Sequence, residues 1–374
     1  MPTGKGYLAV ASVAKGATWG TAVDVDSANA GIKVLNTGIT SAVDFLPDES
    51  ICGKRFKQKS DTGRQDFAGT FEVYNQYSNK NVFMLIAMAM GRAGTPAIVG
   101  LDAADGDRPY AYVGSIKIRD DLEGYFFTMA VDKNVAVHEW TSMKINQLTI
   151  SGEAGDRVKL TFDTIAHRWR STGQTNTSLS SVTEPTPRKY VMFQEGQFRA
   201  TPQANAALDG DNQFYPSAFE IVINNSLDPV LTSKNDPYVD EPIESGGGFS
   251  EVTGTFTIPK YDTTAYESAF VAGTLYKADL RFISSAQVVT AGGGAYYYEQ
   301  NIYLPQIQIN DANAPVEGAG RIAMPIEWHA TEAATAPDGM DGNGANVDSG
   351  ESRGSITRPI EIEYKSVVTT DPLA

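Results

Sequence analysis

Few side chains in this sequence could carry nucleophilic or acid–base chemistry. The 374 residues include one cysteine, Cys52, and three histidines, His138, His167 and His329. The basic neighbours of Cys52 favour a reactive thiolate, but the sequence supplies no partner motif around it. His167 and His329 follow strand-like segments, a position typical of half-exposed structural histidines. We therefore expect no catalytic residues and interpret Cys52 as a loop cysteine.

Metal and nucleotide sites are not predicted either. The acidic segments 102–107 and 338–344 lack the alternating ligand spacing and the final bidentate Glu of an EF-hand loop. A single cysteine excludes a multi-thiolate zinc or iron–sulfur site. The glycine triplets at 246–248 and 292–294 do not precede helix starts and are interpreted as turns, and the chain has no Walker or Gly-x-Ser-x-Gly motif. We expect no metal and no cofactor.

The composition limits the classes of protein further. The chain has 45 acidic and 30 basic residues, a formal net charge of −15, and 41% hydrophobic residues, enough for a substantial core. Proteins that grip nucleic acid need Lys and Arg to neutralise phosphates, so this charge argues against such a role. The most apolar run, residues 82–90, is about half as long as a membrane-spanning helix. We expect no membrane span, and the single cysteine fits folding in a reducing compartment.

Internal repeats organise the chain. The triplet Gly-Thr-Phe occurs at residues 69–71 and again at 254–256, a shift of 185 residues. Each copy is followed by a polar turn and then by a short apolar stretch, residues 82–90 before Gly91 and residues 266–272 before Gly273. Glycine just past the end is a common helix stop, so both stretches are predicted helices.

A second pair of matches lies further along the chain. Residues 145–150 are similar to 304–309, and residues 157–163 are similar to 321–327. The order strand, helix, strand, turn, strand therefore occurs twice, which favours duplication. We predict a first domain over residues 1–175, a Ser/Thr/Pro-rich linker over 176–189, and a second domain over 190–374. A Gly/Asp-rich loop over 331–354 interrupts the second domain.

Apolar and polar residues alternate with a period of two in the repeated segments. Phe71 and Val73 alternate with Thr70 and Glu72, and the same alternation recurs at 255–258, 158–163 and 322–328. The fold class predicted is mainly β: two tandem antiparallel β-sandwich or partial-barrel domains, each with one short flanking helix. Pro325 belongs at a strand edge or a bulge, because proline cannot donate to the strand ladder.

Two stretches carry a family resemblance. The opening AKGATWGTA at residues 14–22 resembles the start of tail tube proteins of long-tailed bacteriophages. The path from FTM at 127–129 through HEW at 138–140 to KINQLTISG at 144–152 is similar to the turn and strands of the same family. The resemblance covers most of residues 10–170 and, more weakly, 190–330. The chain departs from the simplest members in its length, its duplication and the loop at 331–354.

The resemblance implies a structural protein whose sheets join edge to edge around a channel, in rings that stack into a tube through which phage DNA passes. With a duplicated domain, three chains would make a ring of six pseudo-equivalent domains, and six chains per ring is the alternative. Family analogy adds tape-measure, tail-terminator and tail-tip proteins as partners, with DNA only in transit. The protein would be made and assembled in the bacterial cytoplasm and reside in the virion tail.

Two sets of residues are candidates for these functions. The polar strand faces are candidates for the channel wall, and their members are Thr70, Glu72, Thr255, Thr257, Gln306 and Gln308. The loops before the Gly-Thr-Phe strands have opposite charge, a surplus of four positive charges over 51–64 and of five negative charges over 228–251. Opposite patches fix the register between partners, so these loops are candidates to meet during assembly. The loop residues concerned are Lys54, Arg55, Lys57, Lys59, Arg64, Asp236, Asp240, Glu241 and Glu244.

Two other functions remain open on the sequence alone. One is a non-enzymatic β-sandwich virion protein that binds a receptor or a carbohydrate through its Gly- and Tyr-rich loops, such as residues 296–298. The other is a carbohydrate-active enzyme with dispersed carboxylates. Rings or tubes in negative-stain images would separate the tube protein from both.

Overall fold

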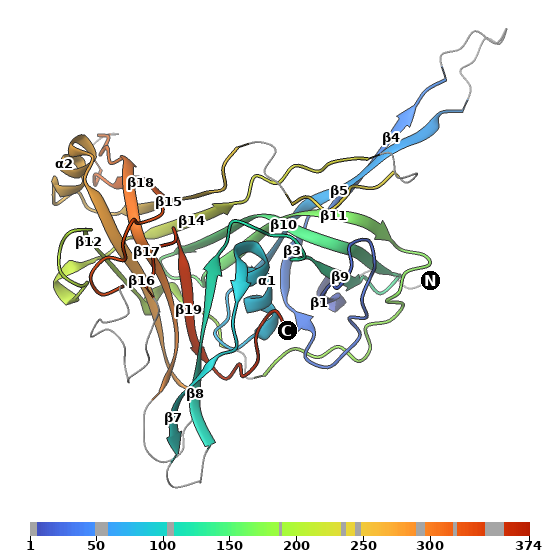
Figure 1. Cartoon of the computed structure of the whole chain (residues 1–374), viewed down its shortest axis with the longest axis horizontal. Coiled ribbons are helices and arrows are strands. Elements are labelled where there is room, and N and C mark those ends of the chain that lie inside the picture. The colour runs from blue at the N-terminus through green and yellow to red at the C-terminus, as the bar shows by residue number, and fades with distance from the viewer. Residues whose placement is uncertain are drawn as a thin grey trace.

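A computed structural model describes residues 6–48, 59–102, 108–186, 189–232, 237–243, 248–288, 296–316, 320–340 and 355–374. Cys52, the glycines at 292–294 and residues 341–354 of the predicted loop lie outside this part of the chain. The described chain is mainly β with two α-helices, as predicted (Figure 1). Three short 3-10 helices complete it: η1 (Gly6–Leu8), η2 (Phe193–Glu195) and η3 (Gly210–Asn212).

The first half of the chain builds an antiparallel sheet with β5 and β1 toward its two sides. Its order is β1–β9–β10–β11–β5, with β2 added beside β1 and with β3 and β4 both paired to β5. The strands are β1 (Val10–Lys15), β2 (Gly31–Ile32), β3 (Val34–Thr37), β4 (Thr40–Leu46), β5 (Asp61–Tyr74), β9 (Phe127–Asp132), β10 (Val137–Glu153) and β11 (Lys159–Arg170).

The second half pairs its strands in the same order. Here the order is β12–β16–β17–β18–β15, with β13 beside β12 and β14 beside β15. The strands are β12 (Gly196–Pro202), β13 (Gln213–Phe214), β14 (Ala218–Asn224), β15 (Glu251–Ile258), β16 (Leu275–Gln287), β17 (Tyr297–Asp311) and β18 (Met324–Ala330). Pro325 pairs with β15 beyond the end of β17, so it occupies an edge position, as predicted.

The Gly-Thr-Phe glycines show why this triplet recurs. A Cβ on Gly69 would lie 2.5 Å from the carbonyl oxygen of Gly38, and Gly69 has a φ of +148°. A Cβ on Gly254 would lie 2.5 Å from the carbonyl oxygen of Glu220. Both glycines therefore let the neighbouring strand approach closely. By strand pairing, Lys144 is equivalent to Gln308. The sequence match of 145–150 with 304–309 would instead make Lys144 equivalent to Tyr303, five residues earlier.

Two strand pairings join the halves into one branched sheet. Seven residue pairs connect β10 to β14, from Gln147 opposite Asn224 to Glu153 opposite Ala218. At the other junction β19 (Glu361–Ser366) lies between β17 and β8. The strand pairings form no closed circuit within the described residues, so the sheet is open. The C-terminal strand therefore pairs with strands from both halves of the chain.

One hydrophobic core serves both halves. Its buried residues run from Ala11 in β1 to Leu373 near the C-terminus, and Lys15 donates a hydrogen bond to the carbonyl oxygen of Leu373. The predicted linker packs closely as well: Leu179 is buried, and Asn176 donates hydrogen bonds to Glu139 and to the carbonyl oxygen of Val23. Residues 176–186 therefore lie against the first half rather than spanning free space.

Both predicted helices are present, but their surroundings differ. Helix α1 (Lys80–Met90) ends at Gly91 and α2 (Ala265–Ala272) ends at Gly273, each glycine in the left-handed conformation. Every residue of α1 after Lys80 is buried, whereas only Ala269 is buried in α2. Between α1 and β9 the chain adds three strands that have no counterpart after α2: β6 (Gly91–Ala93), β7 (Ala97–Asp102) and β8 (Arg108–Ile118).

Candidate functional site

One face of the sheet forms a continuous polar surface across the joint between the halves. Polar side chains of β5, β11, β10, β14, β15 and β18 point to it, because these strands pair in register and each alternates with the core. We call it the polar sheet face. One row across it consists of Glu72, Thr161, Thr149, Val222, Thr253 and His329. The next row consists of Tyr74, Lys159, Ser151, Glu220, Thr255 and Glu327.

The sequence-predicted wall residues fall on this face. Thr70 and Glu72 lie on β5, and Thr255 and Thr257 lie on β15, with β11, β10 and β14 between them. Gln308 continues the first row on β17, opposite His329. The amide of Gln306 donates a 2.6 Å hydrogen bond to the Thr331 hydroxyl. The face that sequence alternation singled out in each half is therefore one surface that runs across both halves.

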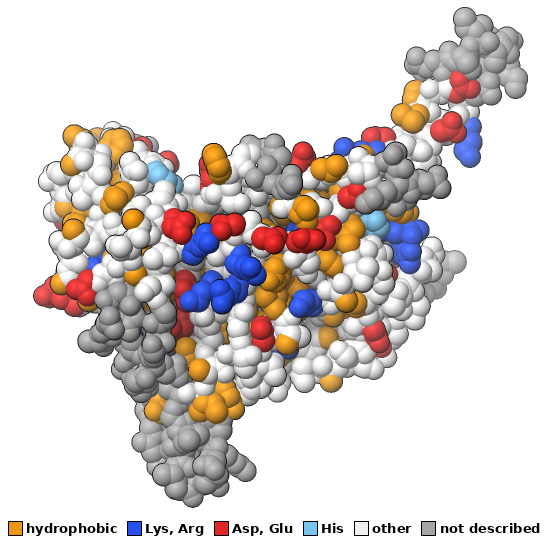
Figure 2. Space-filling view, in the orientation of Figure 1, with side chains coloured by type: hydrophobic (Ala, Val, Ile, Leu, Met, Phe, Trp, Pro, Cys, Tyr) orange, Lys and Arg blue, Asp and Glu red, His pale blue; other side chains and the backbone are white. Residues whose placement is uncertain are grey.

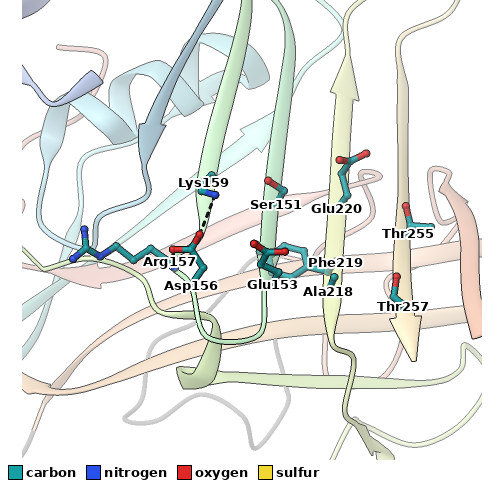
Figure 3. Close-up of a pocket in the computed structure, with 11 residues that line it drawn as sticks. Ser151, Glu153, Asp156, Arg157, Lys159, Ala218, Phe219, Glu220, Thr255 and Thr257 are labelled. Carbon is teal, nitrogen blue, oxygen red and sulfur yellow. Dashed lines mark hydrogen bonds and ion pairs between the residues drawn. The ribbon is translucent and has the colours of Figure 1, made fainter. Parts of the chain in front are cut away.

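A shallow groove of about 360 Å³ lies on the polar sheet face at the β10–β14 joint. Its lining side chains come from β11, β10, β14 and β15, and Figure 3 shows Ser151, Glu220 and Thr255 side by side. The Lys159 ammonium lies 2.9 Å from Asp156, which raises the pKa of Lys159 and lowers that of Asp156 through the hydrogen bond. The eleven lining residues include no histidine or cysteine that could activate a nucleophile. The groove is a mixed-charge surface.

Arg157 lies at one end of the groove, and its side chain extends away from the other lining residues (Figure 3). Its guanidinium lies 4.9 Å from the ring centre of Tyr74 and 4.4 Å from that of Tyr190, on the two aromatic faces. Cation–π contacts of this kind fix an arginine in place. Arg157 therefore holds the residues after the predicted linker against β5.

The three histidines make structural contacts. Nδ1 of His138 accepts a hydrogen bond from the Trp169 indole, and burial lowers the pKa of His138. His167 lies 2.9 Å from the carbonyl oxygen of Val239, and His329 lies 2.6 Å from the amide oxygen of Asn310. Across the described ranges, no group of three or more His, Cys, Asp or Glu side chains is arranged to hold a metal ion.

Another candidate region consists of two segments, here called arms, that precede β5 and β15. The second arm is the segment between β14 and β15, of which residues 225–232, 237–243 and 248–250 are described. It leaves the second half and lies over β10 and β11 of the first half (Figure 1). The Trp19 indole donates to the carbonyl oxygen of Val239, and the backbone NH of Gln65 donates to that of Pro237. The acidic segment thus docks on its own chain.

An ion pair anchors the second arm. The Lys144 ammonium lies 2.6 Å from the Glu241 carboxylate, and the Lys144 side chain is 1% exposed. Burial lowers the pKa of Lys144, and the hydrogen bond to Glu241 offsets part of that shift. Glu241 also accepts from the backbone NH of Gly124. Within its own chain Glu241 therefore pairs with Lys144 of β10. A contact between this loop and the basic loop at 51–64 of another copy stays a prediction.

Other predicted loop residues are accounted for locally. Asp240 accepts a hydrogen bond from Thr232, Arg64 forms an ion pair with Asp66, and Lys59 is exposed. Lys54, Arg55, Lys57, Asp236 and Glu244 lie outside the described residues. Lys144 was not among the predicted partners of this loop. The sequence feature that indicates Lys144 is its position between the apolar residues Met143 and Ile145. A lysine buried among apolar residues requires an acidic partner.

The first arm consists of β4 and the start of β5, Asp61–Asp66. It projects from the body at one end of the molecule (Figure 1). Every β4 residue except Val43 is exposed, including Phe45 at 65% and Leu46 at 59%. Figure 2 shows hydrophobic and charged side chains together on this arm. Exposed apolar side chains on a projecting strand are typical of an interaction surface.

Comparison with known proteins agrees with the chain's architecture. A search of curated proteins found no match. No helix in the described segments has the length and apolar character required to cross a bilayer. The family model for phage tail tube proteins matches residues 6–330, which includes both sets of repeated strands and both helices. Since this match covers most of the chain, the protein belongs to the phage tail tube protein family and is a structural component of a virion tail.

Proposed function

We propose that copies of this chain assemble with one another into rings, and that the rings stack into the tail tube through which phage DNA passes. Each chain contributes two tube units, residues 1–175 and 190–374, so that three chains make a ring with pseudo-six-fold symmetry. The observation that carries this proposal is the edge pairing of β10 with β14, because it joins two equivalent units side by side within one sheet.

One side of this joint has an unused counterpart in the first half. The sheet pairing makes β3 and β4 the counterparts of β14: Thr40 pairs with Ala68 as Val222 pairs with Thr253. The other edge of β14 pairs with β10, but the other edges of β3 and β4 have no strand partner within the described residues. An open edge is a template for pairing with another chain, and ring closure satisfies it.

The polar sheet face is the proposed channel wall. It crosses the joint without a break, so repeating the joint around a ring would extend it around the interior. Acidic side chains outnumber basic ones in its two rows, which carry Glu72, Glu220 and Glu327 against Lys159. An acidic wall would not hold DNA phosphates, whereas a cationic wall would bind them and slow transit.

Electron microscopy of the purified protein, with mass measurement of isolated rings, tests this function. We expect rings or tubes containing three chains per ring. Six chains per ring would contradict the three-chain ring but would still agree with a tube. A monodisperse monomer at high concentration would contradict self-assembly. By family, we also propose contacts with tape-measure, tail-terminator and tail-tip proteins and assembly in the bacterial cytoplasm. Co-purification of these proteins with virion tails checks the contacts.

A further inference from the structure

The two arms occupy equivalent positions in the two halves. Counting along the chain from Thr40 and Val222, which are equivalent by strand pairing, Val43 corresponds to Asn225 and Phe45 to Leu227. The helix ends Gly91 and Gly273 are separated by the same 182 residues as Thr40 and Val222. The arms and the helices can therefore be compared residue by residue.

The second arm docks at the C-terminal end of α1. The Asn225 side chain donates hydrogen bonds to the carbonyl oxygens of Ala89, at 3.0 Å, and Ile145, at 3.1 Å. Two residues later Leu227 is 7% exposed and clusters with Leu122 and Ile165 of the first half. The arm of one unit thus satisfies free carbonyls and buries a leucine on the unit beside it.

The first arm keeps the apolar residue of the second arm but not its hydrogen-bonding one, since Val43 stands at the position of Asn225. Phe45 stands where Leu227 stands in the second arm, yet Phe45 is 65% exposed and Leu46 beside it is 59% exposed. Both lie on β4, which pairs only with β5 in the described structure. The apolar residues of the first arm are therefore exposed in the described part of the chain.

The C-terminal end of α2 lacks a cover as well. Val271 is 85% exposed, whereas its counterpart in α1, Ala89, is fully buried. Phe270 beside it is 39% exposed, and its counterpart Met88 is buried. Only Gly273 and Thr274 separate α2 from β16, so no inserted strands fold over this helix as β6 and β8 fold beside α1.

We propose that the first arm of one copy docks on the C-terminal end of α2 of the next copy, with Phe45 and Leu46 against Phe270 and Val271. The occupant of each surface is a second copy of this chain. This inference rests on the proposed self-assembly and specifies which surfaces meet.

The shape of the molecule gives the contact its direction. The first arm and α2 lie at opposite ends of the longest axis (Figure 1), so one copy cannot satisfy its own two surfaces. The second arm reaches from the second half toward the first, and the first arm continues in that direction. The contact is therefore head to tail, the type of interface that generates closed rings or open filaments.

Cysteine cross-linking tests the contact directly. Because Cys52 is the single cysteine, a Cys52→Ser chain provides a clean background. In that background a chain carrying both Phe45→Cys and Val271→Cys should form a ladder of covalent oligomers under mild oxidation. The matched control combines Phe45→Cys with Val135→Cys, since Val135 is 62% exposed and lies outside both surfaces. Assembly of the cysteine-free chain with no ladder above the control would overturn the inference.

A mixing experiment tests the head-to-tail direction. Phe45→Asp disables the arm and Val271→Asp disables the helix surface, so each variant alone should associate at least about tenfold more weakly than the parent. An equimolar mixture retains one intact joint, from the arm of the Val271→Asp chain to α2 of the Phe45→Asp chain. It should stop at dimers in analytical ultracentrifugation, and Val135→Asp should assemble like the parent.

The outcomes separate this inference from the proposed function. A parent chain that stays monomeric contradicts self-assembly itself. A parent that assembles together with two variants that assemble equally well contradicts only the contact between the first arm and α2. Loss of assembly in Val271→Asp but not in Phe45→Asp would mean that another segment or another protein occupies α2, which also overturns the inference. Circular dichroism of each variant confirms that these exposed substitutions leave the fold intact.

Discussion

Helices α1 and α2 follow the same strand in the two halves, end at equivalent glycines and have opposite surroundings. Helix α1 is enclosed by strands of its own half and by β19, whose Tyr364 stacks on Phe83 with ring centres 4.0 Å apart. Helix α2 packs on β17 and is otherwise largely open. In the first half the cover of the helix comes from the same chain, through the inserted β6–β8 strands and the C-terminal strand. The other unit retains an open surface.

The matched helix positions give the sharpest test of this difference. Met88→Ala should lower the free energy of unfolding by about 4 kcal/mol, because it leaves a cavity in a fully enclosed site. Phe270→Ala at the equivalent position should cost less than about 1 kcal/mol in the unassembled chain, because its side chain is already partly in water. Chemical denaturation of both variants measures the two values. Equal losses would contradict the difference in cover.

The arms can be compared through their ion pairs. Glu241→Gln leaves the buried Lys144 ammonium without its anion and should lower the free energy of unfolding by about 3 kcal/mol. Asp66→Asn on the first arm removes a solvent-exposed partner of Arg64 and should lower the free energy of unfolding by only about 0–1 kcal/mol. The double variant Lys144→Met, Glu241→Gln is the control, since it removes the unpaired charge and should recover most of the loss. If Glu241→Gln is as mild as Asp66→Asn, the second arm is not anchored by this pair.

The strand that covers α1 is held by a buried acid, which makes its attachment pH-dependent. Arg281, Lys365 on β19 and Asn301 surround Glu299 and hold its pKa at about 2, against an ordinary value of 4.5, although burial acts in the opposite direction. A carboxyl whose folded pKa is depressed stabilises the protein above its unfolded pKa, and that stabilisation is lost as the pH falls. Between pH 4.5 and 2 the chain should therefore lose about 2–3 kcal/mol from this site.

Denaturation at several pH values measures that loss, with Glu299→Gln as the comparison. The stability difference between the parent and Glu299→Gln should be constant near neutral pH and should shrink below about pH 4.5. A difference that does not change between about pH 7 and about pH 3 would show that Glu299 is not held as a carboxylate by these cations.

The smallest expected effect on stability concerns the polar sheet face. Glu72→Lys changes an incompletely buried strand position and should shift the free energy of unfolding by no more than about 0.5 kcal/mol. Under the proposed function it should slow DNA passage while tails of normal length still form, because a cation on the channel wall attracts phosphate. Virion infectivity and tail length measure the two effects. Normal infectivity of virions whose tubes contain only the Glu72→Lys chain would contradict the assignment of this face to the channel.

Local patterns in the sequence were sufficient for the elements and for one surface. Residues close together in the chain encode the two helices, the repeated strands and the polar alternation along those strands. The helices end before Gly91 and Gly273, and the alternation includes Thr70, Glu72, Thr255 and Thr257. Helix stops and strand faces depend on such near neighbours, so they could be predicted. The opposite charges of the two loops could also be read from the sequence, but the pairing of Glu241 with Lys144 could not.

Which surfaces meet was decided by the tertiary structure alone. The sequence did not indicate that Glu241 pairs with Lys144, that β19 joins the halves or that α1 is covered while α2 is open. These contacts connect residues far apart in the chain, and their geometry depends on where the inserted strands and the open sheet edges lie. Periodicity in a sequence specifies which face of an element is apolar, but only the folded chain determines what packs against that face.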